Sequence, residues 1–420
     1  MTPPASALAD RYLPELEETL RENVLGFWFP RCIDDEGGFL TSYDREGDFA
    51  GNDHKQVITQ ARMTWLAARL IREGYGSEYR DVADHGFAFL VGELWDDDNG
   101  GFVWEVGRDG TVVKPNKHLY GQAFGLYALS EYHRATGDER AAAHAHELVD
   151  LLDRNAKDDD HGGYVEYFTP AWEPITEGRT YLDAIEPDWS PKESAEDVLD
   201  PTLKLMNTHL HLLEGFTAYY RAFGTERGRR RLHELLDVLT TTVVRTRLGA
   251  CTDKYTPEWH PKTDDEAFRI VSYGHDLENV WLTMEAADAL GLAVDPFTDL
   301  YETLWEYAIE YGYDDDHGGF YFYGGFGEPA RFRVKAWWVQ AECLTSAIRM
   351  YEHTGDRTYL DVFTETYEFL DRHQIDREHG EWHAGVDDDL EPVGRKGAVY
   401  KAAYHNGRAL LESMATLRRL

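Results

Sequence analysis

A short turn of acidic residues, followed by two glycines and an aromatic residue, recurs along the chain and constrains the fold most. Clear copies are Asp34-Asp-Glu-Gly-Gly-Phe39, Trp95-Asp-Asp-Asp-Asn-Gly-Gly-Phe102, Asp158-Asp-Asp-His-Gly-Gly-Tyr164 and Asp314-Asp-Asp-His-Gly-Gly-Phe320. A weaker copy is Asp376-Arg-Glu-His-Gly380-Glu-Trp382, and Leu248-Gly249-Ala250 occupies the remaining place. Counted at Gly38, Gly101, Gly163, Gly249, Gly319 and Gly380, successive steps are 63, 62, 86, 70 and 61 residues. Such a period is typical of a repeat architecture, so we predict six structural units.

Between these acidic turns lie pairs of segments with apolar residues at helical spacing. Helix-ending signals follow several of them, as in Ala135-Thr-Gly-Asp138 and Glu352-His-Thr-Gly-Asp356, where Gly suits a left-handed C-cap and Asp the next N-cap. The pattern predicts twelve helices near residues 8–28, 54–74, 79–94, 117–136, 138–156, 204–224, 226–247, 272–290, 296–312, 333–353, 357–374 and 398–418. Two helices in each of six units predict an all-α (α/α)6 barrel, a toroid of six helix pairs with short β-hairpin turns at the rim.

The less charged, more aromatic helix of each pair should lie inside the toroid, because it packs on both neighbours. This criterion selects the second helix and every alternate helix after it. Their starts carry polar and aromatic residues, namely Arg62, Tyr120, Gln122, Asn207, His211, His275, Glu278, Trp337, Trp338 and His405. We expect these residues to line a pocket at the mouth of one catalytic domain spanning 1–420. The insertion at 168–201, rich in Pro, Glu and Asp, is expected to cover part of the mouth.

The formal net charge is -36, which disfavours binding to nucleic acid or to an anionic membrane. We interpret the acidic excess as a halophilic surface that stays hydrated in molar salt, where the Debye length is about 3 Å. The three cysteines, Cys32, Cys251 and Cys343, form no CxxC pair, which favours a reducing compartment. With no signal-like N-terminus and no membrane-length apolar stretch, we expect a cytoplasmic monomer or homodimer.

The acidic turns could be read as calcium sites. Their spacing lacks the alternate-position Asp ladder and the distal Glu of a calcium loop. A tight turn whose aromatic ring packs into the rim explains the Gly-Gly-aromatic sequence better.

Two His-x-x-Glu pairs, His211 with Glu214 and His275 with Glu278, place a histidine and a carboxylate one helical turn apart. One interpretation is a metal site, but the order is the reverse of that in di-iron bundles and the bridging glutamates are missing. The other is general acid–base catalysis, in which the glutamate fixes the histidine tautomer. His405 starts a third inner helix, and together the three histidines favour catalysis without a metal or cofactor. His209 points elsewhere and is interpreted as structural.

Motifs for a serine nucleophile, a phosphate loop or a dinucleotide site are absent from the sequence. Aromatic residues are instead numerous near the proposed mouth. They are Trp65, Tyr120, Trp259, Trp337, Trp338, Trp382 and Tyr400. Such rings can stack on sugar faces, although aromatic residues also fill helix cores.

Five stretches make the chain resemble the N-acylglucosamine 2-epimerase superfamily, and within it the cellobiose 2-epimerases. These are Gln60-Ala-Arg62-Met-Thr-Trp65, Lys204-Leu-Met-Asn207-Thr-His-Leu-His211-Leu-Leu-Glu214, Ser272-Tyr-Gly-His275-Asp-Leu-Glu278, Trp337-Trp-Val-Gln-Ala-Glu342 and Tyr404-His405-Asn-Gly-Arg408. They follow family order over nearly the whole chain. The resemblance implies an α/α barrel of six helix pairs, which agrees with the repeat count.

The resemblance further implies metal-free epimerisation or isomerisation of an open-chain aldose through a cis-enediolate. His275 and His405 would exchange the C2 proton from opposite faces, His211 would assist ring opening, and Arg62 would stabilise the oxyanion. Asn207, Glu278 and Tyr120 would orient these groups and the sugar hydroxyls. The remaining expected sugar contacts are Trp337, Trp338, Glu342, Trp382 and Tyr400.

The chain departs from the cellobiose epimerases at Tyr400 and Ala403, where Trp and Pro are usual, and at Ala384, where a second aromatic residue is usual. A mannose- or glucose-size substrate therefore rivals a disaccharide. Three other functions stay open: an aldose–ketose isomerase, a glycoside hydrolase or lyase on an α/α barrel, and a non-catalytic sugar-binding module.

Overall fold

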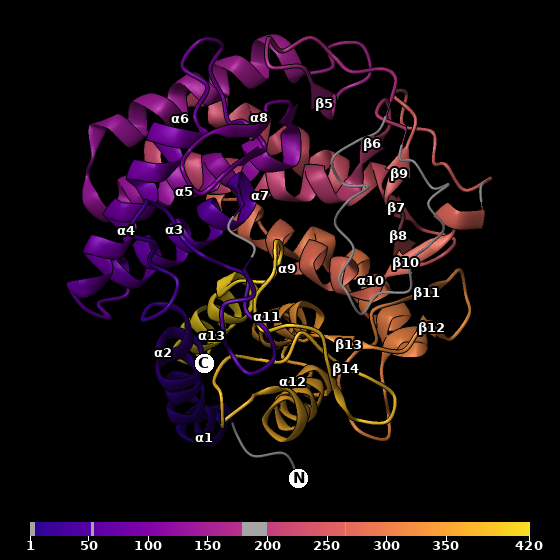
Figure 1. Cartoon of the computed structure of the whole chain (residues 1–420). Helices are drawn as coiled ribbons and strands as arrows, with labels where there is room; N and C mark the ends of the chain where they lie inside the picture. The colour runs from indigo at the N-terminus through magenta and orange to yellow at the C-terminus, as the bar shows by residue number, and fades with distance from the viewer. Residues whose placement is uncertain (1–4, 52–53, 179–199, 265) are drawn as a thin grey trace.

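The computed structural model describes residues 5–51, 54–178, 200–264 and 266–420, and helices are its main secondary structure (Figure 1). The α-helices are α1 (Ala5–Glu18), α2 (Gly26–Trp28), α3 (Val57–Arg72), α4 (Glu78–Phe89), α5 (Leu119–Thr136), α6 (Glu139–Leu151), α7 (Met206–Phe223), α8 (Glu226–Asp237), α9 (Tyr273–Leu290), α10 (Thr298–Gly312), α11 (Trp337–Thr354), α12 (Arg357–Phe369) and α13 (Tyr404–Leu417). A π-helical segment, Thr19–Leu25, joins α1 to α2, so these described residues form twelve helical stretches. Each overlaps one of the twelve predicted ranges.

Four outer helices also end in π-helical turns, at Leu90–Leu94, Leu152–Ala156, Val238–Thr242 and Leu370–Gln374. Short 3-10 turns are at Glu266–Phe268 and Asp295–Phe297. Left-handed glycines end the inner helices, as predicted: Gly137 follows α5 and Gly355 follows α11. Asp138 and Asp356 then cap α6 and α12 by accepting backbone N–H groups.

Six helices form an inner ring in which α3, α5, α7, α9, α11 and α13 contact one another in chain order, and α13 closes on α3 (Figure 1). The outer helices α4, α6, α8, α10, α12 and α1 each pack mainly on one inner helix, and α8 also contacts the next inner helix, α9. The sequence explains this division, because α7 is buried along most of its length whereas α8, ERGRRRLHELLD, buries only one face. The chain is an all-α toroid, closed by contact between its first and last helices.

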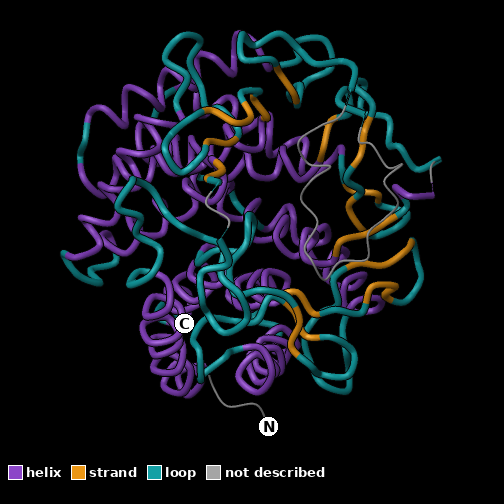
Figure 2. Tube along the Cα trace, in the orientation of Figure 1, coloured by secondary structure: helices purple, strands orange, loops and turns teal. Residues whose placement is uncertain are grey.

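Short antiparallel strands lie beside the helix ends (Figure 2). They are β1 (Lys55–Gln56), β2 (Glu105–Val106), β3 (Val112–Lys114), β4 (Lys117–His118), β5 (Tyr167–Phe168), β6 (Lys204–Leu205), β7 (Val244–Arg245), β8 (Ala250–Cys251), β9 (Lys254–Tyr255), β10 (Ile270–Ser272), β11 (Tyr323–Gly325), β12 (Ala330–Phe332), β13 (Lys335–Ala336), β14 (Gly385–Val386) and β15 (Pro392–Val393). The strand before an inner helix pairs with a strand after the next turn, as in Lys55 with Val106. Five such pairs, β1–β2, β4–β5, β6–β9, β10–β11 and β13–β14, fasten successive units together.

A buried lysine neutralises the first aspartate of each of the five acidic turns. The Nζ to carboxylate distances are 2.7 Å for Lys55–Asp34, 2.6 Å for Lys117–Asp96, and 2.7 Å for Lys204–Asp158, Lys335–Asp314 and Lys396–Asp376. Burial raises the pKa of Asp158, but bonds from Lys204 and backbone N–H groups outweigh it and hold the pKa at about 2. The turn thus receives its cation from the protein, which favours the structural interpretation over calcium.

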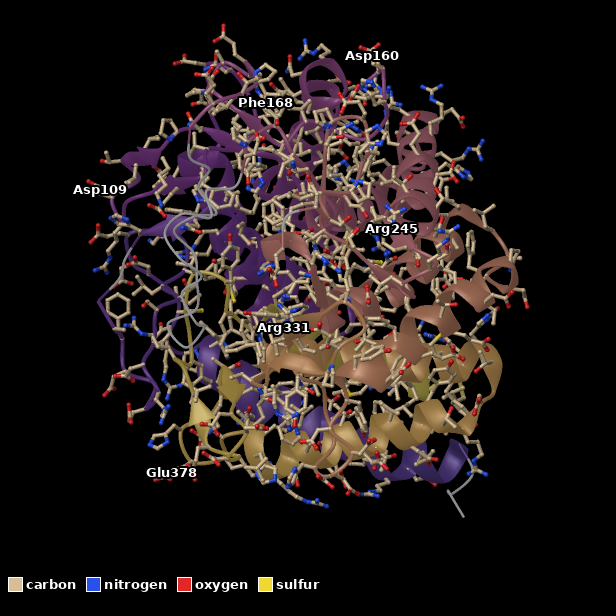
Figure 3. The ribbon with its side chains drawn as sticks, turned by 90° about the vertical axis from the view of Figure 1, so that its right-hand side faces the viewer. Asp109, Asp160, Phe168, Arg245, Arg331 and Glu378 are labelled. Carbon is tan, nitrogen blue, oxygen red and sulfur yellow. The ribbon has the colours of Figure 1, made fainter. Side chains whose placement is uncertain are left out.

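A second repeated contact fixes the starts of four inner helices, α3, α5, α7 and α11, against their turns. The side-chain amides of Gln60, Gln122 and Gln340 each bond both the N–H and the C=O of the turn's aromatic residue. His209 takes the equivalent place and accepts the N–H of Tyr164 at 3.0 Å. This contact gives His209 the structural role expected of it. Figure 3 shows how widely the turns are spread, with Asp160 and Glu378 at opposite edges of the molecule.

Several bulk expectations can be compared with the structure. All three cysteines are buried and free. Within the described ranges, no helix combines the length and the apolar character needed to cross a bilayer. Most of the predicted cover at 168–201 falls on 179–199, which lie outside the described residues.

Candidate active site

The structure brings the predicted site residues together at the starts of the inner helices. The guanidinium of Arg62 on α3 donates to the hydroxyl of Tyr120 on α5 at 3.1 Å. The Tyr120 ring lies 5.0 Å from that of His211 on α7, measured between centroids. Across the ring of helices, Trp338 on α11 contacts two histidines, with centroid distances of 4.8 Å to His275 and 5.7 Å to His405. All six inner helices contribute to this cluster.

His211 is paired with a carboxylate as its spacing predicted. Its Nδ1 lies 3.0 Å from Oε2 of Glu214, one turn along α7. Both side chains are 2 % exposed. Burial lowers the pKa of His211, although Glu214 opposes this effect. At neutral pH the ring is an uncharged base whose Nδ1 is held by a carboxylate.

His405 is paired with Glu342, a carboxylate from a different helix. Its Nδ1 lies 2.6 Å from Oε1 of Glu342 on α11, while Trp281 donates to Oε2 of the same carboxylate at 2.7 Å. Burial lowers the pKa of His405 well below its usual value, and the charges of Arg62 and Arg408 add to this effect. Glu342, expected to contact the sugar, therefore orients a histidine.

His275 is not paired with Glu278, contrary to the prediction from their spacing. Glu278 turns instead to Arg408, with 2.8 Å between its Oε1 and the NH2 group. His275 is partly exposed, and among the described residues no hydrogen bond holds its ring. Burial lowers its pKa to about 4, against the opposing charge of Asp253. The prediction failed because Glu278 lies one helical turn deeper, where Arg408 offers a stronger partner than a neutral imidazole.

Arg62 lies within a cage of aromatic rings. Its guanidinium carbon is 4.2 Å from the ring centroid of Phe124 and 4.7 Å from that of Tyr404. It also donates to the carbonyl oxygen of Tyr400 at 3.2 Å. The side chain is 2 % exposed, and its Nε has no hydrogen-bond partner in the part of the chain that the structure describes. A buried cation with an unused donor can bind an oxygen that becomes negative during a reaction.

Further buried polar atoms without partners belong to predicted sugar contacts. They are Oδ1 of Asn207, Oε2 of Glu278, Nε1 of Trp337 and the hydroxyl of Tyr400. Buried polar atoms are rarely left unpaired, so these four are available to bind the hydroxyl groups of a ligand. Trp382 is 0 % exposed and bridges Ile375 on the backbone. Its Nε1 likewise has no partner among the described residues, and its contact with a sugar stays a prediction.

The centre of the site is an arginine that sequence reasoning did not assign. Arg408 on α13 is 1 % exposed and donates to carboxylates on α7, α9 and α11. A repeat-based signal could have found it, because the residue seven positions after a buried lysine points inward in several units. Counted from the strand residues Lys55, Lys204 and Lys335, those positions are Arg62, His211 and Glu342, and Arg408 stands seven positions after Lys401, which bonds Glu381.

Three residues of this cluster could in principle hold a metal ion. One ligand atom from each of Glu278, Glu342 and His405 lies within 4.8 Å of the others. The NH2 group of Arg408 already lies between the carboxylates, 2.8 Å from Glu278 and 2.7 Å from Glu342. Since a guanidinium supplies the positive charge there, the donor set fits a metal ion poorly.

The chain is similar to known proteins over nearly its whole length. The family model for N-acylglucosamine 2-epimerase (GlcNAc 2-epimerase) matches residues 37–186 and 176–409. The cellobiose 2-epimerase of Bacteroides fragilis is 30% identical over 403 residues, covering 95% of this chain and 97% of its own. The D-mannose isomerase of Marinomonas mediterranea is 25% identical, covering 94% of this chain and 95% of its own.

A solved structure shows the same fold. The cellobiose 2-epimerase from Bacillus thermoamylovorans superposes with a TM-score of 0.85 at 26% identity, and the match covers 98% of this chain and 100% of that one. The family model spans most of the sequence, and each matched protein is covered over nearly its full length. The chain belongs to the N-acylglucosamine 2-epimerase family.

Proposed function

We propose that this protein is a carbohydrate 2-epimerase that acts on the open-chain form of a reducing-end aldose of the cellobiose, mannose or glucose type. The observation that carries the proposal is that His275 and His405, from different inner helices, both contact Trp338, at 4.8 and 5.7 Å between ring centroids, so that two candidate bases lie at one place. Two bases approaching one carbon from different directions are what inversion at C2 requires. The similarity to cellobiose 2-epimerases supports the same activity.

The reaction begins with opening of the sugar ring, assigned to His211. Its Nδ1 is held by Glu214, so Nε2 is left to exchange a proton with the ring oxygen or the anomeric hydroxyl. Opening exposes the C1 aldehyde, which makes the proton at C2 acidic. Arg62 donates to Tyr120, which is a neighbour of His211. Its unpaired Nε can stabilise the sugar oxygen that becomes negative.

Inversion then needs one proton transfer on each face of C2. One histidine of the pair accepts the C2 proton, and the electron pair of the broken C–H bond moves into the enediolate. The second histidine donates a proton to C2 on the opposite face, and the electrons return to regenerate the aldehyde. Glu342 beside His405 and the charge of Asp253 near His275 stabilise each ring when it carries a proton.

An aldose–ketose isomerase is the second candidate, supported by the likeness to a D-mannose isomerase. Both reactions pass through the same enediolate and use the same residues. They differ in the last step, because an isomerase returns the proton to C1 and a ketose accumulates. A glycoside hydrolase would need a carboxylate pair facing the sugar, whereas Glu278 and Glu342 are both occupied by Arg408.

The finer features of the fold belong to the same proposal. Six inner helices, each covered by one outer helix, support an (α/α)6 barrel, and the strand pairs beside the helix starts support hairpins at its rim. We further propose a single catalytic domain without a metal or organic cofactor. The partly exposed His275 would then lie at the substrate entrance.

The test is proton NMR of the purified protein in heavy water and molar KCl, with mannose, glucose and cellobiose supplied separately. Deuterium at C2 together with the C2 epimer is the result expected of an epimerase. Accumulation of a ketose would assign the isomerase instead. New reducing ends without exchange at C2 would contradict both.

A further inference from the structure

Arg408 contacts carboxylates from three other inner helices. One guanidinium nitrogen, NH1, donates to Oε1 of Glu214 on α7 and to the hydroxyl oxygen of Tyr404, which itself donates to that Oε1. The other, NH2, donates to Glu278 on α9 at 2.8 Å and to Glu342 on α11 at 2.7 Å. Each of the four side chains is at most 3 % exposed. A planar guanidinium imposes fixed directions on these bonds, which an ammonium does not.

Two of the three carboxylates each hold a histidine. Glu214 lies 3.0 Å from Nδ1 of His211, and Glu342 lies 2.6 Å from Nδ1 of His405. The histidines are on different helices, and no hydrogen bond joins them directly within the described residues. The connection between them runs from His211 through Glu214, Arg408 and Glu342 to His405.

The charges of the cluster stabilise these hydrogen bonds. Burial raises the pKa of Glu214, but Arg408 and His211 reverse the effect and bring it to about 2. Burial and the nearby Glu342 raise the pKa of Glu278 well above its usual value. Burial raises the pKa of Glu342 as well, and the charge of Arg408 opposes this effect. A buried network of this kind has one favourable arrangement and resists distortion.

We infer that Arg408 is the positioning residue that sets His211 and His405 relative to each other, by holding the two glutamates that hold their Nδ1 atoms. The inference rests on the proposed function, in which His211 opens the sugar ring and His405 exchanges the C2 proton. Arg408 therefore serves both half-reactions, although it contacts neither histidine. Loss of the planar guanidinium slows both half-reactions, whereas loss of Glu342 slows only the exchange at C2.

The test measures the two half-reactions separately in three variants. Ring opening is followed by polarimetry, as enzyme-accelerated mutarotation of α-glucose, and C2 exchange by deuterium uptake from heavy water. Arg408→Lys keeps the positive charge but loses the planar guanidinium. We expect it to lower kcat for both reactions about 10- to 100-fold with little change in KM. Glu342→Gln lowers C2 exchange alone.

Arg349→Lys is the matched control. Arg349 is a half-buried arginine of an inner helix, 14 % exposed, that bonds two carboxylates, Asp288 and Glu352. It lies 12 residues beyond Trp337 on α11, about 18 Å along the helix at 1.5 Å per residue. This variant changes neither reaction.

Mutarotation at the wild-type rate in Arg408→Lys, or a loss expressed only in KM, would overturn the inference. Should Arg408→Lys fail to fold, Tyr404→Phe removes the hydroxyl between Arg408 and Glu214 with little change in volume. Slower mutarotation in that variant supports the connection, and an unchanged rate overturns it. A wild-type protein that accelerates mutarotation without any C2 exchange would refute the proposed function itself.

Discussion

Nδ1 of His405 lies 2.6 Å from Oε1 of Glu342, a carboxylate 63 residues earlier in the chain and on a neighbouring inner helix. This contact decides which ring nitrogen faces the sugar, because Nδ1 is occupied and only Nε2 remains. It also places a negative charge where the ring becomes positive on taking up a proton. The adjacent helices α11 and α13 thus supply one catalytic unit between them.

Replacement of Glu342 by Gln should therefore impair catalysis more than binding. The amide cannot accept the Nδ1 proton and stabilise the charged ring as a carboxylate does, so we expect kcat to fall about 10- to 100-fold. Steady-state kinetics with the best sugar measures this change. Glu285→Gln is the control, because Glu285 is a half-buried glutamate of an inner helix that pairs with Arg221 instead of a histidine. Equal losses in the two variants would show a general structural effect.

The pH dependence of kcat/KM should show an unusually acidic limb. A histidine acts as a base only when neutral, and burial lowers the pKa of His275 from its usual value of 6.5 to about 4. As the pH falls, the base form thus persists below pH 6.5 and is lost near pH 4. A profile between pH 4 and 8 measures this limb. An inflection at or above pH 6.5 would show that partial burial does not lower the pKa of His275.

The stability of the toroid should depend on the lysine–aspartate pairs of the acidic turns. Lys335 and Asp314 are 2 % and 9 % exposed, so Lys335→Met leaves a buried carboxylate without its cation. We expect a loss of about 3–5 kcal/mol in the free energy of unfolding, measured by urea denaturation.

The control for that measurement is an ion pair on the surface. Arg331 and Glu328 are 48 % and 57 % exposed at 2.9 Å, and Arg331→Met should cost no more than about 1 kcal/mol. If both substitutions cost equally little, the lysine–aspartate pairs do not hold the units together.

Much of the fold could be predicted from the sequence because its signals are local and repeated. The acidic turns, the Gly-Asp helix junctions and the apolar periodicity each involve neighbouring residues. Because they recur along the chain, the repeat can be recognised from the sequence. The structure confirms the twelve helical stretches and shows the reason for the acidic turns, namely a lysine from further along the chain that bonds the first aspartate. That ion pair joins residues 20 or 21 positions apart in four turns and 46 in the third, beyond the reach of helical periodicity.

The site was predicted less completely, because its decisive contacts cross the toroid. Helical spacing correctly paired His211 with Glu214, since both residues lie on one helix. The same spacing failed for His275, because Glu278 bonds to Arg408 from a helix 130 residues later. The partner of His405 was likewise on another helix. Residue spacing predicts which side chains are neighbours within one helix. Contacts at the centre of the toroid join side chains of different helices, so they depend on how the ring of helices closes.

High salt should stabilise this protein. With a formal net charge of -36, the folded chain repels itself at low ionic strength, and molar salt shortens the Debye length to about 3 Å. We expect Tm to rise between 0.1 M and molar KCl, in a scan followed by circular dichroism. A Tm that is unchanged or lower in molar KCl would refute the interpretation of the acidic surface as halophilic.

The most direct test of the two-base reaction is deuterium exchange in His275→Asn and His405→Asn, each supplied separately with the two C2 epimers in heavy water. If the histidines serve opposite faces of C2, each variant keeps one base. Each should then place deuterium at C2 of one epimer, a different one for each variant, without converting either epimer into the other. A single variant that still interconverts the epimers at the wild-type rate would contradict the assignment of these histidines as the catalytic pair.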